Sequence, residues 1–395
     1  MSLRLIALNP DLQRLRDEGY ELEIRSNYLL VHSVPYVNSR REVARGTLVS
    51  EMNMASPGVL DRPNTHQIYF VGEHPCNPDG SELVQIKNGT TTYQLGDNLV
   101  ANHYFSNKPK SGAYENYYEK VTSYVRVISN QAKAIDPAAD ARTWKTVDSI
   151  EEESVFLYED TASSRAGIQA IAARLKHQRI AIVGLGGTGA YVLDLVAKTH
   201  VTEIHLYDGD RYRQHNAFRS PGAASRGMLE RRLSKVAYWV EVYSAMRTGI
   251  VPHEVMINET NVAELYGYDF VFVCVDKGEV RQLIVNALER QSTRFVDVGM
   301  GINLTDDRSQ LWGTCRVTTS TPETRLLATA RIPKVDRDDE VYGSNIQIAD
   351  LNCLNATLAV MKWKRLSEFY INDRAEYDST YNVNLNQLTN EEGGS

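Results

Sequence analysis

A glycine-rich turn between an apolar run and a helical pattern is the part of this sequence that most directly indicates chemistry. The run RIAIV (179–183) leads into GLGGTG (184–189). A backbone without Cβ can turn tightly and bring its N–H groups against phosphate oxygens at a helix N-terminus. The next apolar run ends at Asp208, 24 residues after the first glycine, where a carboxylate accepts hydrogen bonds from ribose hydroxyls. We therefore predict a nucleotide site that includes Gly184, Gly186, Gly187 and Gly189. The alternative is a glycine-rich turn that serves only packing.

The polar residues that follow Asp208 narrow the nucleotide class. The segment YDGDRYRQHNAFRS (207–220) also contains Asp210, Asn216 and Arg219, a set richer than a simple NAD ribose contact requires. Lys235 lies on the next predicted helix, and VCVD ends at Asp276. An NAD-dependent oxidoreductase gives no role to Asn216, Arg219 or Lys235, so we keep it only as an alternative reading.

The elements that would position these residues begin near residue 163. Short apolar strands alternate there with helices, which predicts a parallel sheet with helical crossovers, a Rossmann-like, doubly wound α/β domain. Residues 318–345 show no clear periodicity, and this length marks a functional crossing loop or a poorly ordered segment. The predicted strands are 179–183, 203–207, 269–273 and 294–298, and the predicted helices are 166–175, 191–199, 233–246, 280–290 and 350–369.

The N-terminal part of the chain reads differently. A helix over 8–18 is followed by strand-like segments ELEIR, YLLVHSVPYV, GTLVSEM and HQIYFVG, dense turns, and a helix over 114–134. This indicates an α+β, mainly antiparallel domain. A length of 395 residues also favours two domains. We expect the domains to span residues 1–150 and 151–375, with a polar tail over 376–395 that adds one edge strand and ends in disorder at EEGGS.

Composition excludes several classes of function. The chain is 42% hydrophobic and 24% charged, as in ordinary packed domains. Its net charge of −7 is opposite to that of a typical nucleic-acid binder. No run reaches about 18 apolar residues, so we expect no membrane span or export signal. The four cysteines include no CxxC pair, which indicates a reducing cytoplasm and no zinc ribbon.

Four ordered motifs together resemble the ThiF/MoeB/HesA-type adenylyltransferase superfamily, which includes the ubiquitin-activating enzymes. They are GLGGTG, the run from Asp208 to Arg219, Lys235, and VCVD ending at Asp276. The resemblance covers about residues 163–370. It implies ATP-dependent adenylation of the C-terminal carboxylate of a ubiquitin-like or sulfur-carrier protein, as the activating enzyme of a bacterial ubiquitin-like pathway. A non-catalytic scaffold with this fold is the remaining alternative.

The resemblance also implies roles for single residues. Arg219 and Lys235 would stabilise the charge that accumulates on the phosphates, although Arg232 could replace Lys235 because the preceding insert is longer than usual. Asp276, at the carboxyl end of a parallel strand, would hold Mg²⁺. Asp208 would bind the ribose and Asn216 the phosphates, and Asp210 would orient the loop or metal-bound waters.

An arginine from an N-terminal segment, often the partner subunit's, reaches the γ-phosphate in this superfamily. Arg165 in DTASSRAGI resembles it. If this residue acts across an interface, the active unit is a homodimer with C₂ symmetry.

The sequence departs from the family in its cysteines. Relatives that form a thioester carry a thiol near the crossing loop, whereas Cys274, Cys315 and Cys353 fall in strands or an apolar helix and resemble core residues. Cys76, in the turn GEHPCNPDG, looks the most exposed and is a candidate thiol, or a metal ligand with His66, His74 and His103. The alternative is a polar loop. The zinc-binding CxxC pairs of many relatives are absent.

The N-terminal domain has two further resemblances. HPCNPDG is similar to the turn of ubiquitin-conjugating enzymes, whose fold suits the order helix, meander, turn, helix. However, Leu83, Val84 and Gln85 stand where the catalytic cysteine would follow. The segments THQIYFVGEHPCNPDG and HYFSNKP also resemble an uncharacterised domain fused to bacterial ThiF-type proteins. We therefore expect a carrier- or partner-binding domain.

Overall fold

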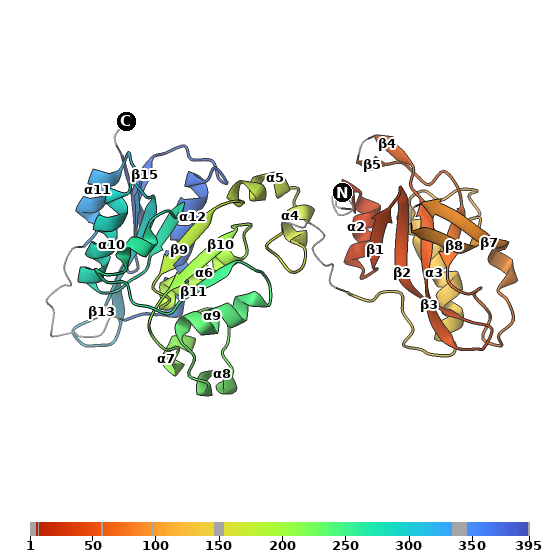
Figure 1. The fold of residues 1–395 in the computed structure, drawn as a ribbon, viewed down its shortest axis with the longest axis horizontal. Coiled ribbons are helices and arrows are strands. Elements are labelled where there is room, and N and C mark those ends of the chain that lie inside the picture. The colour runs from red at the N-terminus through yellow and green to blue at the C-terminus, as the bar shows by residue number, and fades with distance from the viewer. Residues whose placement is uncertain are drawn as a thin grey trace. The chain divides into compact units, whose positions relative to one another are not determined.

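The computed structural model describes the chain apart from residues 1–4, 7, 57, 97, 146–153, 334–345 and 394–395. It divides into two compact units (Figure 1). The first comprises residues 1–148 and 160–168, and the second comprises residues 149–159 and 169–395. The boundary that the sequence predicts near residue 150 lies outside the described residues.

The first unit is built on a six-stranded antiparallel sheet in the order β1-β2-β3-β6-β8-β7. The predicted meander is confirmed, and the β7–β8 hairpin is an addition that the sequence did not indicate. The strands are β1 (Leu22–Arg25), β2 (Tyr28–Val37), β3 (Val43–Glu51), β6 (Gln67–Val71), β7 (Lys87–Gly96) and β8 (Leu99–Ser106), with a small pair, β4 (Met54–Ser56) and β5 (Val59–Leu60).

Helix α3 (Tyr117–Lys133) supplies much of the core of this unit. Its first turn is capped by Asn116, whose side chain accepts a hydrogen bond from the Glu119 N–H at 2.8 Å. Its buried residues recur at helical spacing, so one face packs on the sheet. The shorter helices are α2 (Pro10–Asp17) and the 3₁₀ turn η1 (Val84–Ile86).

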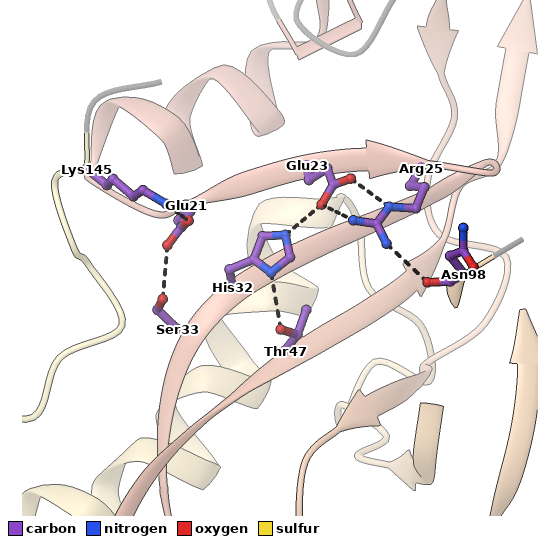
Figure 2. A network of polar contacts seen from close by, with 8 residues as sticks. All are labelled: Glu21, Glu23, Arg25, His32, Ser33, Thr47, Asn98 and Lys145. Atoms are coloured by element: carbon purple, nitrogen blue, oxygen red, sulfur yellow. Dashed lines mark hydrogen bonds and ion pairs between the residues drawn. The ribbon is translucent and has the colours of Figure 1, made fainter. Parts of the chain in front are cut away.

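A polar network ties the edge strand β1 to its neighbours (Figure 2). Glu23 pairs with Arg25 at 2.7 Å and with the His32 ring at 2.9 Å, and His32 also contacts Thr47 on β3. Glu21 accepts from Lys145 at 2.8 Å. The Glu23–His32 contact joins β1 to β2 and the His32–Thr47 contact joins β2 to β3, as cross-strand pairs do.

Lys120 is an unusual member of the α3 core and yields a stability prediction. It is fully buried, donates to Ser50 Oγ at 2.9 Å, and burial lowers its pKa to about 8. Because the unfolded chain, with a pKa near 10.5, binds more protons between pH 8 and 10.5, stability rises with pH through that window. Lys120→Met is therefore expected to raise the free energy of unfolding at pH 7 by about 3 kcal/mol.

Denaturant unfolding of the full chain at pH 7 and pH 10 checks this expectation. Lys133→Met, on the exposed end of the same helix, is the matched control and should leave stability nearly unchanged. A loss of stability in Lys120→Met would contradict the assignment of Lys120 as a destabilising buried charge.

The second unit contains an eight-stranded mixed sheet in the order β11-β10-β9-β12-β13-β14-β15-β16. The first five strands are parallel and the pairs from β13 to β16 are antiparallel. The predicted Rossmann-like part is confirmed. The polar tail contributes the last two strands where one edge strand was expected, and Glu391 and Glu392, expected to be disordered, belong to the second of them. The strands are β9 (Arg179–Val183), β10 (Glu203–Tyr207), β11 (Ile250–His253), β12 (Phe270–Val273), β13 (Phe295–Leu304), β14 (Leu311–Ser320), β15 (Glu376–Asn382) and β16 (Gln387–Glu392).

The helices that accompany this sheet differ from prediction mainly at their starts. The helix expected over 166–175 is instead short, and the one expected to begin at residue 191 begins at Gly187, within the glycine turn. The helices are α5 (Gln169–Ala172), η2 (Ala173–Leu175), α6 (Gly187–Ala197), α7 (Gln214–Ala217), α8 (Arg226–Glu230), α9 (Lys235–Ser244), η3 (Val262–Leu265), α10 (Gly278–Arg290), α11 (Arg325–Arg331) and α12 (Ala349–Leu366).

The sheet arrangement decides where the polar residues meet. Strands β10, β9 and β12 are parallel neighbours, so their carboxyl ends lie at one edge. Gly184, Asp208 and the loop to Asp276 follow these three ends. Ligands bind at this edge of parallel sheets.

Candidate active site

The glycine turn joins β9 to α6 with almost no room for side chains. Gly184 has φ +91°, and a Cβ there would lie 2.6 Å from the Cys274 carbonyl oxygen. A Cβ on Gly189 would lie 1.8 Å from the Gly184 carbonyl oxygen. At Gly186, the N-cap of α6, a Cβ would meet nothing within 4 Å. Gly184 and Gly189 are thus needed for packing, and Gly186 leaves the helix N-terminus open to an anion.

Asp208 and Asp210 are held by Lys235. Asp208 is 6% exposed, and its Oδ2 accepts from the Leu185 N–H at 2.7 Å and from Lys235 Nζ at 3.2 Å. Lys235 Nζ also contacts Asp210 Oδ2 at 2.8 Å. Lys235 is the first residue of α9 and is buried. Its ammonium group is therefore committed to two carboxylates, and removing it would leave Asp208 as an uncompensated buried charge.

Asn216 shapes the turn that carries Arg219. Asn216 is 3% exposed, its Oδ1 accepts from the Arg213 N–H at 2.8 Å, and its carbonyl oxygen accepts from the Arg219 N–H at 3.1 Å. Arg219 is half-buried, and its Nε is a buried donor without a hydrogen-bond partner among the described residues. A buried guanidinium nitrogen without an acceptor suits a site for an anionic ligand.

The residues around Arg219 are strongly basic. Between residues 211 and 235 the chain has seven Lys or Arg and one acidic residue, Glu230. Arg232, the alternative to Lys235, is exposed in the turn before α9, where its carbonyl oxygen accepts from Arg211 at 3.0 Å. The segment gives this edge a positive charge that the net charge of −7 does not reveal.

Asp276 is exposed in the loop after β12. The preceding residue, Val275, accepts a hydrogen bond through its carbonyl oxygen from Arg281 at 2.6 Å. Arg281 forms an ion pair at 3.1 Å with Asp297, which is fully buried in β13. Asp297 and Arg281 thus fix the loop that presents Asp276. Neither residue is among the predicted site residues, although an aspartate within the apolar run RFVDV is a signal for Asp297.

A second missed residue, Asn352, lies on α12. It is fully buried, accepts from Thr188 Oγ1 at 2.9 Å, and donates to the Arg219 carbonyl oxygen at 3.2 Å. It therefore joins the first turn of α6 to the turn that carries Arg219. The amphipathic pattern of α12 predicted a helix but not this role.

The structure places the cysteines mainly in the core. Cys76 was expected to be exposed, and this is wrong: it is 2% exposed, because its N–H pairs with Val37 of β2 at 2.7 Å. Burial raises its pKa, as it does for Cys274, and raises the pKa of Cys315 to about 11. These environments disfavour the thiolate that nucleophilic attack needs. Cys353 is half-buried on α12, beside Asn352.

The predicted γ-phosphate ligand, Arg165, is the last residue of α4 (Thr161–Arg165). This helix groups with the first unit, and the side chain of Arg165 lies outside the described part.

The described residues contain no group of three or more His, Cys, Asp or Glu residues that could hold a metal ion. The candidate cluster of His66, His74 and His103 is therefore not among such groups. In the described part of the chain no helix is both long and apolar enough to cross a membrane.

Two family models match consecutive parts of the chain. Residues 160–348 match the ThiF family, and residues 10–161 match a domain of unknown function (DUF6791). No curated protein matches the sequence.

Several solved structures are similar to part of this chain. E. coli MccB with AMPCPP and MccA is 15% identical, with 60% of this chain and 72% of that chain covered and a TM-score of 0.45. PaaA is 15% identical, with 57% and 76% covered and a TM-score of 0.44. E. coli MccB with ATP is 15% identical, with 57% and 67% covered and a TM-score of 0.42. On the family match, residues 160–348 form a ThiF-family domain that follows an N-terminal DUF6791 domain.

Proposed function

We propose that the ThiF domain binds ATP with Mg²⁺ and adenylates the C-terminal carboxylate of a ubiquitin-like or sulfur-carrier protein. The observation that carries this proposal is the buried Nε of Arg219, which has no hydrogen-bond partner within the described part of the chain. It lies on a turn that Asn352 joins to the open N-terminus of α6. A guanidinium group and free helix N–H groups are a matched pair of phosphate ligands.

In the proposed reaction, a carboxylate oxygen of the carrier attacks the α-phosphorus of ATP. The bond between the α-phosphorus and the bridging oxygen breaks, and that oxygen leaves with pyrophosphate, so an acyl-adenylate forms. Arg219 and the N–H groups of α6 stabilise the negative charge that accumulates on the phosphates. Lys235 acts mainly by orienting Asp208 toward the ribose, since both of its carboxylate contacts are made within the chain.

Asp276 fits a Mg²⁺ ligand. Mg²⁺ is commonly held in nucleotide sites by one or two carboxylates with phosphates and waters, so a single exposed carboxylate at this edge suffices. When bound there, the ion would neutralise phosphate charge. The Arg281–Asp297 pair holds the loop that carries this carboxylate.

Isothermal titration calorimetry tests the nucleotide assignment. We expect ATP with Mg²⁺ to bind the full chain at micromolar concentrations and NAD to bind far more weakly. Tighter binding of NAD than of ATP would overturn the proposal and favour the oxidoreductase alternative.

The proposed homodimer yields a prediction about Arg165. If Arg165 serves the partner's site, Arg165→Ala and Asp276→Asn are each inactive alone, but equal mixtures recover about a quarter of wild-type activity. Half of the dimers are then mixed, and each mixed dimer has one intact site. ATP–pyrophosphate exchange after subunit mixing measures this. No recovery, with both variants folded, would contradict a role for Arg165 across the interface.

A further inference from the structure

We propose that Asn352 is a positioning residue for the phosphates of ATP, an inference that rests on the proposed function. It acts through the geometry that it imposes on the first turn of α6 and on Arg219, without touching the nucleotide itself. No other described side chain is hydrogen-bonded to both of these segments.

Both polar atoms of the Asn352 side chain form hydrogen bonds. Oδ1 accepts from Thr188 Oγ1 at 2.9 Å, and Nδ2 donates to the Arg219 carbonyl oxygen at 3.2 Å. Neither a carboxylate nor an aliphatic side chain of the same size can make both contacts. Because Asn352 is fully buried, water cannot substitute for either bond without opening the structure.

Gly187 makes room for this amide. A Cβ at residue 187 would lie 2.0 Å from Asn352 Nδ2 and 2.4 Å from its Cγ. The third glycine of the turn is therefore matched to an asparagine some 165 residues later in the sequence. This close approach sets the distance between α12 and the first turn of α6, whose N–H groups are the proposed phosphate donors.

The consequence is that one side chain fixes two phosphate ligands relative to each other. The backbone of Arg219 is anchored on the Asn352 amide, and α6 is anchored on the same amide through Thr188. Small displacements of the groups that hold a phosphate strongly reduce both its binding and the rate of its reaction. Loss of Asn352 should therefore affect ATP much more than the acyl substrate.

Asn355 provides a matched control on the same helix. It is also fully buried, but it donates to the Gly299 carbonyl oxygen at 3.1 Å, on β13. Asn352→Ala and Asn355→Ala remove the same group at the same depth of burial. They should lower the melting temperature by similar amounts, while only the first disturbs the phosphate ligands.

The test measures ATP affinity by calorimetry and the KM values in ATP–pyrophosphate exchange. We expect Asn352→Ala to weaken ATP binding and raise the KM for ATP at least tenfold, with the KM for the acyl substrate changed less than twofold. Asn355→Ala should change each less than twofold. Thr188→Val should reproduce part of the Asn352→Ala defect, and Thr188→Ser, which keeps the hydroxyl, should restore near-normal values.

The outcomes separate this inference from the function on which it rests. Equal effects of Asn352→Ala and Asn355→Ala on ATP affinity would show a merely structural role and overturn the inference alone. A normal KM for ATP in Thr188→Val would contradict the claim that Asn352 acts on ATP through its hydrogen bond to α6. Failure of the wild-type chain to bind ATP would overturn the proposed function together with the inference.

Discussion

Arg219→Ala is expected to lower ATP–pyrophosphate exchange by a factor of about 100 or more, because it removes a preorganised cation from the phosphates. Its Nε is buried, and none of the residues that the structure describes accepts a hydrogen bond from it. Arg219→Lys should recover little activity, since the compact ammonium group lacks the planar arrangement of N–H donors with which a guanidinium group binds two phosphate oxygens at once. Initial rates at saturating ATP measure the effect.

Arg213→Ala is the matched control for this prediction. Arg213 lies in the same basic segment and is exposed, so the change in net charge is identical. We expect it to change the exchange rate less than about threefold, in line with a screened surface charge. If the two variants lost activity equally, the overall positive charge of the segment would explain phosphate binding, and a specific contact of Arg219 would not.

Asp276→Asn is expected to reduce exchange by about 100-fold or more and to raise the Mg²⁺ concentration needed for half-maximal activity. The substitution keeps the size of the side chain and removes its charge. Because the loop is held through Val275, Arg281 and Asp297, the variant should fold normally. A magnesium titration of the exchange rate provides the measurement.

Glu279→Gln is a suitable control, because Glu279 is an exposed acid in the first turn of α10, three residues later. It should leave the dependence on Mg²⁺ unchanged. Undiminished exchange in Asp276→Asn would remove Asp276 from the metal assignment, and a shift of the same size in Glu279→Gln would indicate a nonspecific charge effect.

The parallel strands were predictable because they are buried on both faces. RIAIV and EIHLY consist mostly of apolar residues, four of the five residues are buried in each, and both strands have the predicted bounds. The antiparallel part was less visible. Strand β15 buries polar residues, Asp378 and Ser379, and Thr318 on β14 donates to the Asp378 carboxylate. A strand whose interior is polar has no hydrophobic pattern to reveal it.

The candidate site shows the same limit. Its glycines and charged residues follow strand ends, a local pattern, so the sequence indicated them directly. Asn352 and Asp297 gain meaning only from partners distant in the chain, such as Thr188 and Arg281. Cys76 was misjudged because turn residues surround it, whereas its backbone pairs with Val37 and draws the thiol into the core.

The role of the N-terminal domain as a carrier- or partner-binding module stays a prediction. Its antiparallel sheet and α3 form a core of their own, separate from the core of the ThiF domain. We therefore expect deletion of this domain to leave ATP binding by the ThiF domain intact.

ATP–pyrophosphate exchange with small carrier proteins encoded beside this protein's gene tests the central claim most directly. We expect exchange that requires Mg²⁺ and a free C-terminal carboxylate, so a carrier whose C-terminus is amidated should support none. Exchange that proceeds equally with the amidated carrier, or turnover of ATP to ADP and phosphate without exchange, would contradict adenylation of a C-terminal carboxylate.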